Sequence, residues 1–103
     1  MSKSGAKYEI AEPAQEDVDS IFEYSVKSFG LAQTQIYMMQ MAETIRFISE
    51  NQKVGKARSE IKVGLYSMVF NSHLIFYRIL GTKIKVIRVL HGSRDLTEDS
   101  WFK

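Results

Sequence analysis

The sequence predicts a single α+β domain, in which a helical hairpin packs on one face of a small, twisted and largely antiparallel sheet. Two segments, Leu74–Leu80 and Lys83–Leu90, are rich in β-branched and aromatic residues and flank the two-residue turn Gly81-Thr82. Two helical patterns meet at Gly30, which is typical of an antiparallel hairpin. The predicted order of elements is therefore β-α-α-β-β-β.

Length and composition agree with one domain. The chain has 103 residues, 45% hydrophobic and 25% charged, which are ordinary globular values. We expect residues 1–103 to form the domain, with residues 1–6 as a flexible tail and 96–103 as a carboxy-terminal tail. The absence of Cys excludes disulfides and thiolate metal ligands. Neither a signal peptide nor an apolar run of about 20 residues occurs, so we expect a cytoplasmic protein without membrane association.

The first half of the chain predicts one short strand and two helices. Lys7–Ala11 is a candidate strand, and Pro13 suits the first turn of a helix that runs to about Ser28. The second helix, Leu31–Glu50, follows almost at once. Helical spacing within the first helix relates Val18, Ile21, Phe22, Ser25 and Phe29.

The second helix is apolar on more than one side. One stripe contains Met38, Met41, Ile45 and Ile48, whereas Ile36, Met39 and Phe47 point elsewhere, with Tyr37 between. Two interpretations remain open. Either the helix presents a wide core face to the sheet, or part of it is covered by another chain, for which adaptable methionines are suited.

The second half predicts the remaining strands. Asn51–Gly64 is a polar loop rich in Lys and Arg, and Leu65–Phe70 is an apolar strand that ends at the turn Asn71-Ser72. Pairing across Gly81-Thr82 predicts two faces for the last two strands. The core face would carry Ile75, Tyr77, Ile79, Ile84, Val86 and Leu90, with Arg88 as its odd member, and the other face Leu74, Phe76, Arg78, Lys83, Lys85, Ile87 and Val89.

Charge is unevenly distributed along the chain. Residues 1–50 hold four basic and eight acidic residues, a net charge of −4, and residues 51–103 hold ten basic and four acidic residues, a net charge of +6. This pattern indicates either an anionic partner for the second half or neutralisation between acidic helices and a basic sheet within the fold.

Four segments together resemble the ParE toxins of the ParE/RelE superfamily, from bacterial toxin–antitoxin systems. They are EDVDSIFEYSVKSFGLAQTQIYMMQM (16–41), NQKVGKARSEIKVGLYS (51–67), SHLIFYRI (72–79) and VIRVLHGSRD (86–95). The resemblance covers about nine-tenths of the chain. The combination of SHLIFYR with RVLHGSRD at this separation is the specific part of it.

The resemblance implies a compact toxin that poisons DNA gyrase, alone or in its complex with DNA, and a ParD-like antitoxin that wraps the toxin. Two histidines that are distant in sequence, His73 and His91, and the lack of cysteine argue against a metal site, and we expect no cofactor and no small-molecule ligand. The antitoxin-binding candidates are Ile36, Tyr37, Met39 and Phe47. The candidates for contact with the target are Arg58, Arg78, Arg88, His91, Arg94 and Asp95.

The main alternative is ribosome-dependent mRNA cleavage, which the RelE branch of the superfamily performs. Cleavage needs an acid–base pair beside cations. His91 could supply one member, but the tail LTEDSWFK contains neither tyrosine nor histidine, so we expect no enzymatic activity. A third hypothesis is direct nucleic-acid binding, because Phe76 and Tyr77 lie near the basic edge. A net charge of +2 is low for a dedicated binder.

Overall fold

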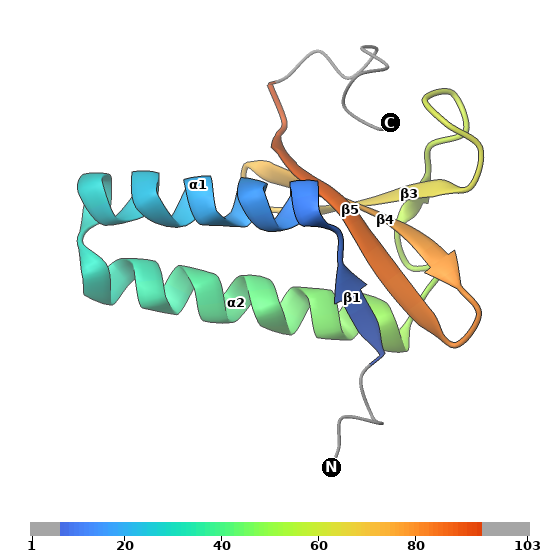
Figure 1. Ribbon diagram of the computed structural model, residues 1–103, viewed down its shortest axis with the longest axis horizontal. Helices are drawn as coiled ribbons and strands as arrows, with labels where there is room; N and C mark the ends of the chain where they lie inside the picture. The colour runs from blue at the N-terminus through green and yellow to red at the C-terminus, as the bar shows by residue number, and fades with distance from the viewer. Residues whose placement is uncertain (1–6, 94–103) are drawn as a thin grey trace.

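The structure, a computed structural model, describes residues 7–93, and it has two helices and one sheet (Figure 1). The predicted tails, with Arg94 and Asp95, lie outside the described residues. The predicted α+β order is confirmed, with one addition, the two-residue strand β2 inside the polar loop. The elements are β1 (Tyr8–Ile10), α1 (Glu12–Phe29), α2 (Leu31–Glu50), β2 (Lys56–Ala57), β3 (Leu65–Phe70), β4 (His73–Leu80) and β5 (Lys83–His91).

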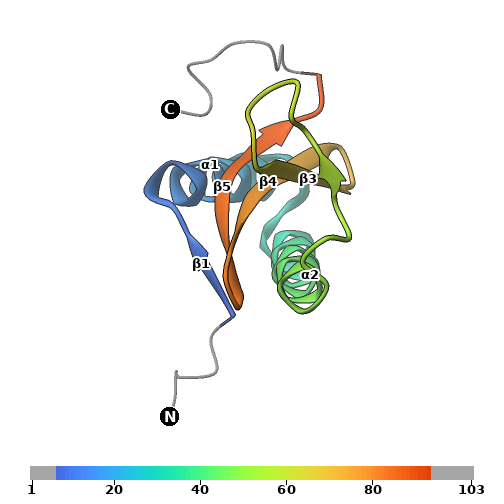
Figure 2. The same cartoon turned by 90° about the vertical axis from the view of Figure 1, so that its right-hand side faces the viewer.

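The sheet has the strand order β1-β5-β4-β3-β2. Strands β2 to β5 pair antiparallel with their neighbours, while β1 lies parallel to β5 and pairs only with Ile84–Val86. The prediction of a largely antiparallel sheet is therefore confirmed. Both helices lie between β1 and the other strands in sequence, so the chain leaves one edge of the sheet at β1 and, after the helical hairpin, returns at β2 on the opposite edge (Figure 2).

A single glycine joins the two helices. Gly30 has φ 88°, a backbone conformation that is strained for any residue with a side chain. Its N–H donates to the Val26 carbonyl oxygen at 2.9 Å. The buried Thr34 hydroxyl donates to the Gly30 carbonyl oxygen and lies 2.8 Å from the Ser25 hydroxyl. These contacts fix the antiparallel hairpin at its closed end.

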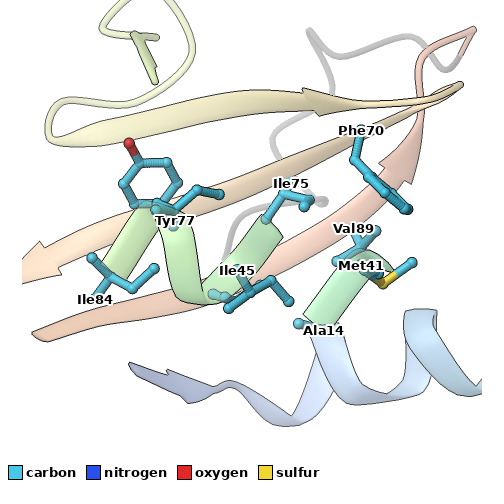
Figure 3. Packing of buried hydrophobic residues seen from close by; sticks show 10 residues of the cluster. Ala14, Met41, Ile45, Phe70, Ile75, Tyr77, Ile84 and Val89 are labelled. Atoms are coloured by element: carbon cyan, nitrogen blue, oxygen red, sulfur yellow. The ribbon is translucent and has the colours of Figure 1, made fainter. Parts of the chain in front are cut away.

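The main core lies between the hairpin and the sheet (Figure 3). Three of the four residues of the predicted inner stripe of α2, Met41, Ile45 and Ile48, are at most 3% exposed, whereas the fourth, Met38, is only partly buried. The three buried residues pack against buried side chains of α1 and of the strands β3, β4 and β5. The other members of this cluster are Ala14, Phe70, Ile75, Tyr77, Ile84, Val86 and Val89.

The predicted faces of β5 are correct only near the turn. The pairing shifts between Phe76 and Tyr77, where a β-bulge places Ile87 as an extra residue on β5. One extra residue exchanges the two faces beyond it. Val89 therefore joins the main core, and Leu90 joins the opposite side, contrary to the prediction.

The opposite side of the sheet has a small core of its own. Leu65, Phe76 and Leu90 are at most 2% exposed there, and Ile61 packs against them from the loop between β2 and β3. Figure 2 shows this loop on the side of the sheet away from α2. Each face of the sheet is therefore covered, one by helices and the other by a loop.

Candidate functional site

A cleft opens where the closed end of the hairpin extends beyond the sheet. Its volume is about 750 Å³. Figure 1 shows both helices continuing past the β3–β4 end of the sheet. The walls come from α1, α2 and the β3–β4 turn. Its lining residues are Ser20, Ile21, Tyr24, Ser25, Phe29, Gln33, Tyr37, Asn71, Ser72, His73 and His91.

The two histidines, 18 positions apart in sequence, meet on one side of this cleft. His73 and His91 are directly opposed on β4 and β5, and their ring centroids lie 5.5 Å apart in an edge-to-face arrangement. The Tyr37 hydroxyl lies 3.1 Å from His73 Nδ1, and its ring packs at 5.0 Å on Phe70. The proximity of the two histidines depends on strand register, which the local sequence pattern around each histidine does not determine.

Burial changes the acid–base properties of this group. It lowers the pKa of His73, because the imidazolium would lose water, and the neighbouring His91 lowers that pKa further. Burial also raises the pKa of Tyr37 above its ordinary value. Both side chains are therefore neutral near pH 7, and they present uncharged hydrogen-bonding groups to the cleft beside its aromatic walls. This chemistry suits binding.

The antitoxin-binding candidates divide into two kinds. Ile36, Met39 and Phe47 are 50%, 60% and 46% exposed, and their helical spacing places them along one stripe of α2. Tyr37 instead turns inward to Phe70 and His73. The structure therefore brings three of the four candidates together on the surface. Their role remains a prediction.

The target-binding candidates with described positions are dispersed. Arg58 Nη1 donates to the Ser67 hydroxyl, its Nε to Glu60, and its guanidinium carbon lies 5.9 Å from the Phe76 ring centroid. Arg78 Nη1 donates to the Val63 carbonyl oxygen at 3.1 Å. Both arginines therefore hold the loop that covers the second core.

Arg88 and His91 lie away from that loop. Arg88 forms a two-pronged ion pair with Asp17 of α1 and is 17% exposed, so it does not extend into water from the sheet edge as an isolated arginine would. His91 Nδ1 lies 2.8 Å from the Ser93 hydroxyl and accepts the Ser93 backbone N–H. The described candidates do not converge on one catalytic centre.

Sequence reasoning did not identify two contributors to this architecture. Asp17 was not separated from the other acidic residues of its helix. Tyr77 was predicted on the core face without a partner for its hydroxyl, yet this hydroxyl donates to the Gln52 carbonyl oxygen at 2.7 Å and accepts the Gly55 N–H at 3.0 Å. A tyrosine among aliphatic core residues could have indicated such a contact, because a buried tyrosine hydroxyl usually has a hydrogen-bond partner.

Residues 7–93 contain neither a metal-ligand cluster nor a membrane-spanning helix. In that range no three His, Cys, Asp or Glu side chains gather as metal ligands would. No helix there is both long and apolar enough to cross a bilayer.

Comparison with known proteins places these features in a family context. A family model described as "ParE toxin of type II toxin-antitoxin system, parDE" matches residues 8–96. Toxin ParE1 of Caulobacter vibrioides is 33% identical over 86 residues, which are 84% of this chain and 88% of that protein. Toxin ParE1 of Mycobacterium tuberculosis is 29% identical over 92 residues, which are 88% and 94% of the two chains.

A solved structure has the same fold. It is described as a chromosomal ParDE TA system from P. aeruginosa, and it aligns with a TM-score of 0.72 over 86% of this chain and 98% of that chain. The sequences are 17% identical, so this likeness concerns the fold.

Proposed function

The chain belongs to the ParE toxin family of type II toxin–antitoxin systems, and we propose that it inhibits DNA gyrase and is neutralised by a ParD-like antitoxin. The family match over residues 8–96 carries this proposal, because it covers every described element. Gyrase inhibition also places its site of action in the cytoplasm.

An antitoxin is supported by the distribution of exposed apolar side chains. Ile36, Met39 and Phe47 form an outward stripe on α2, which already buries a separate inward stripe in the core. A surface helix of a monomeric domain ordinarily has one such stripe. Burial of apolar surface contributes about 25 cal/mol per Å², so an amphipathic antitoxin segment laid along this stripe would bind favourably.

A non-enzymatic mode of action is supported by the state of the described cations. Arg58 contacts Glu60 and Ser67, and Arg88 contacts Asp17. Moving either guanidinium to a phosphate would break these bonds. His91 is likewise held by Ser93. Cleavage of mRNA would require a cation and an acid–base pair around one phosphate, and these residues are committed elsewhere.

Inducible expression in bacteria, combined with assays on purified components, tests the proposal. We expect growth arrest with a DNA-damage response, and inhibition of DNA supercoiling by purified gyrase. Rapid mRNA cleavage with supercoiling unaffected would contradict the gyrase proposal and support the RelE-type alternative. The variant His91→Ala separates the two hypotheses further. The nuclease alternative requires this variant to lose mRNA cleavage, whereas the gyrase proposal expects at most weaker binding or lower stability.

The antitoxin part has its own test. The product of an adjacent short reading frame, with a DNA-binding amino terminus and an acidic amphipathic tail, should co-purify with this chain and restore supercoiling. Failure of such a protein to bind the chain would contradict this part and leave the gyrase result intact.

A further inference from the structure

The sheet face that lies away from the helices is basic. Strand register defines it, because directly opposed residues share a face. Lys56 is opposite Ser67, which is opposite the buried Phe76 of the second core, and Arg78 lies between Leu65 and Lys85. With the covering loop, this basic sheet face comprises Lys56, Arg58, Lys62, Arg78, Lys83 and Lys85, and its acidic members are Glu9 and Glu60.

The helical layer has the opposite charge. Helices α1 and α2 carry seven acidic residues and two basic ones, Lys27 and Arg46. The net charge of +2 for the whole chain therefore averages an acidic layer and a basic one. Separation of charge between two faces creates a local field that a small net charge conceals.

The cations of the basic sheet face repel one another. Arg78 and Lys85 are directly opposed across β4 and β5, an arrangement that destabilises a sheet. Glu9 is the acid beside them, and it is shared: Lys83 Nζ lies 3.1 Å and Lys85 Nζ 3.9 Å from its carboxylate. One carboxylate cannot neutralise three cations, so an anion placed over this face would relieve the repulsion.

Exposed apolar anchors distinguish the two faces. Among the described residues, every exposed aromatic side chain and the exposed methionine belong to the helices. The basic sheet face and its rim expose aliphatic residues only, such as Val63 and Leu80. Protein partners are bound mainly through aromatic, methionine and arginine anchors in buried pockets. The two arginines of this face, Arg58 and Arg78, are bound within the fold to the loop and to Ser67, so its remaining cations are dispersed ammonium groups, which are typical of contact with phosphates.

We propose that the basic sheet face binds the phosphate backbone of duplex DNA, independently of sequence. Phe76 and Tyr77 are fully buried, so these rings are unavailable to stack on bases, and the contact is made through phosphates. The choice of DNA over an acidic protein rests in part on the proposed function, because gyrase acts on duplex DNA. The face would then hold the toxin on the DNA that its target handles.

Fluorescence anisotropy of a labelled 20-base-pair duplex, with the purified chain and no gyrase, tests this inference. We expect the logarithm of the association constant to fall with the logarithm of the salt concentration with a slope of about −3 to −4, since the face carries four lysines and each phosphate contact contributes about 0.9. Lys56→Gln combined with Lys85→Gln should reduce this slope by about 2 and weaken binding roughly tenfold at 0.1 M salt.

The matched control is Lys27→Gln combined with Arg46→Gln on the helical layer, which should leave DNA binding nearly unchanged. Equal loss in both double variants would overturn the assignment to the sheet face. Absence of duplex binding by the wild-type chain at 50 mM salt, together with lysine-dependent binding of polyglutamate, would replace DNA with an acidic protein. The same variants are also tested in supercoiling assays with gyrase. Because the anisotropy assay contains no gyrase, a failure of the DNA-binding inference can be distinguished from a failure of the gyrase proposal.

Discussion

Asp17 of α1 and Arg88 of β5 form a two-pronged ion pair, in which Oδ2 accepts from Nε and Oδ1 from Nη2, both at 2.7 Å. The same Oδ2 accepts the Val89 backbone N–H at 2.9 Å. Because β1 pairs with β5 only at Ile84–Val86, no strand of residues 7–93 lies beside Val89 on the edge of β5 that faces away from β4. Asp17 therefore ties the first helix to the sheet and satisfies a donor on the strand edge.

Replacement of Asp17 should destabilise the fold. Asp17→Asn removes the charge opposite a guanidinium that is only 17% exposed, and we expect the free energy of unfolding to fall by about 2 kcal/mol. Urea denaturation measures this change. Asp19→Asn is the control, because Asp19 is exposed and contacts only Gln15 in the described contacts, and it should change stability by less than about 0.5 kcal/mol. Equal effects in the two variants would contradict the structural role of the ion pair.

The contact between Tyr77 and the loop should be measurable at both ends. Tyr77→Phe removes a hydroxyl that bonds Gln52 and Gly55, and should cost about 1–2 kcal/mol. Gly55→Ala would place a methyl group 2.6 Å from the same hydroxyl, and should cost about 1–3 kcal/mol.

Thermal unfolding provides the comparison for this loop. Tyr66→Phe is a control for the hydroxyl, since its ring stacks on Tyr77 at 5.5 Å without a described hydroxyl contact. Gly92→Ala is a control for the added methyl group, because its nearest atom would be 3.4 Å away. Both controls should unfold within a few degrees of the wild type. A Tyr77→Phe protein as stable as the wild type would show that the loop does not depend on this hydroxyl.

Stability should decrease as the pH falls below about 6.5, owing to His73. Its pKa is lowered in the fold by burial and by His91, so the unfolded chain takes up a proton more readily than the folded one. The contribution is complete above the ordinary pKa of 6.5 and is lost as the pH falls through the lower folded value. Urea denaturation at pH 7.5 and 5.5 should show this loss, and His73→Gln should reduce the difference. An unchanged pH dependence in His73→Gln would assign the effect to other groups.

The outward stripe of α2 should control neutralisation by the antitoxin. Met39→Glu places a charge where an apolar side chain is 60% exposed, and we expect antitoxin affinity to fall at least tenfold with little change in stability. Isothermal titration calorimetry with the antitoxin encoded by the adjacent reading frame measures this affinity. Val69→Glu is the matched control, because Val69 is 66% exposed on the other side of the sheet. An equal loss in Val69→Glu would move the antitoxin surface away from α2.

Local patterns accounted for most secondary structure. The bounds of α2 and β3 agree with the prediction, and the remaining main elements differ from it by one or two residues. The strand β2 was missed because two residues in a polar loop, Lys56 and Ala57, carry no periodic signal. The bulge on β5 was missed because residues 86–90 are apolar at every position except Arg88, so either register places apolar side chains on both faces.

The candidate site was less predictable. The sequence identified Ile36, Met39 and Phe47 as surplus to one core stripe, since helical spacing depends only on position along the chain. It could not pair His73 with His91, or Arg88 with Asp17, because these partners are set by strand register and by the docking of a helix.

By itself the sequence determined the order of elements, the helical hairpin, the inner stripe of α2 and the family, because each depends on local periodicity or on motifs. Only the tertiary structure decided which residues of β5 face the core, how Arg58, Arg78 and Arg88 are bound, and that the charges separate into an acidic helical layer and a basic sheet face. Those features depend on contacts between distant segments, and a one-residue change in register alters all of them.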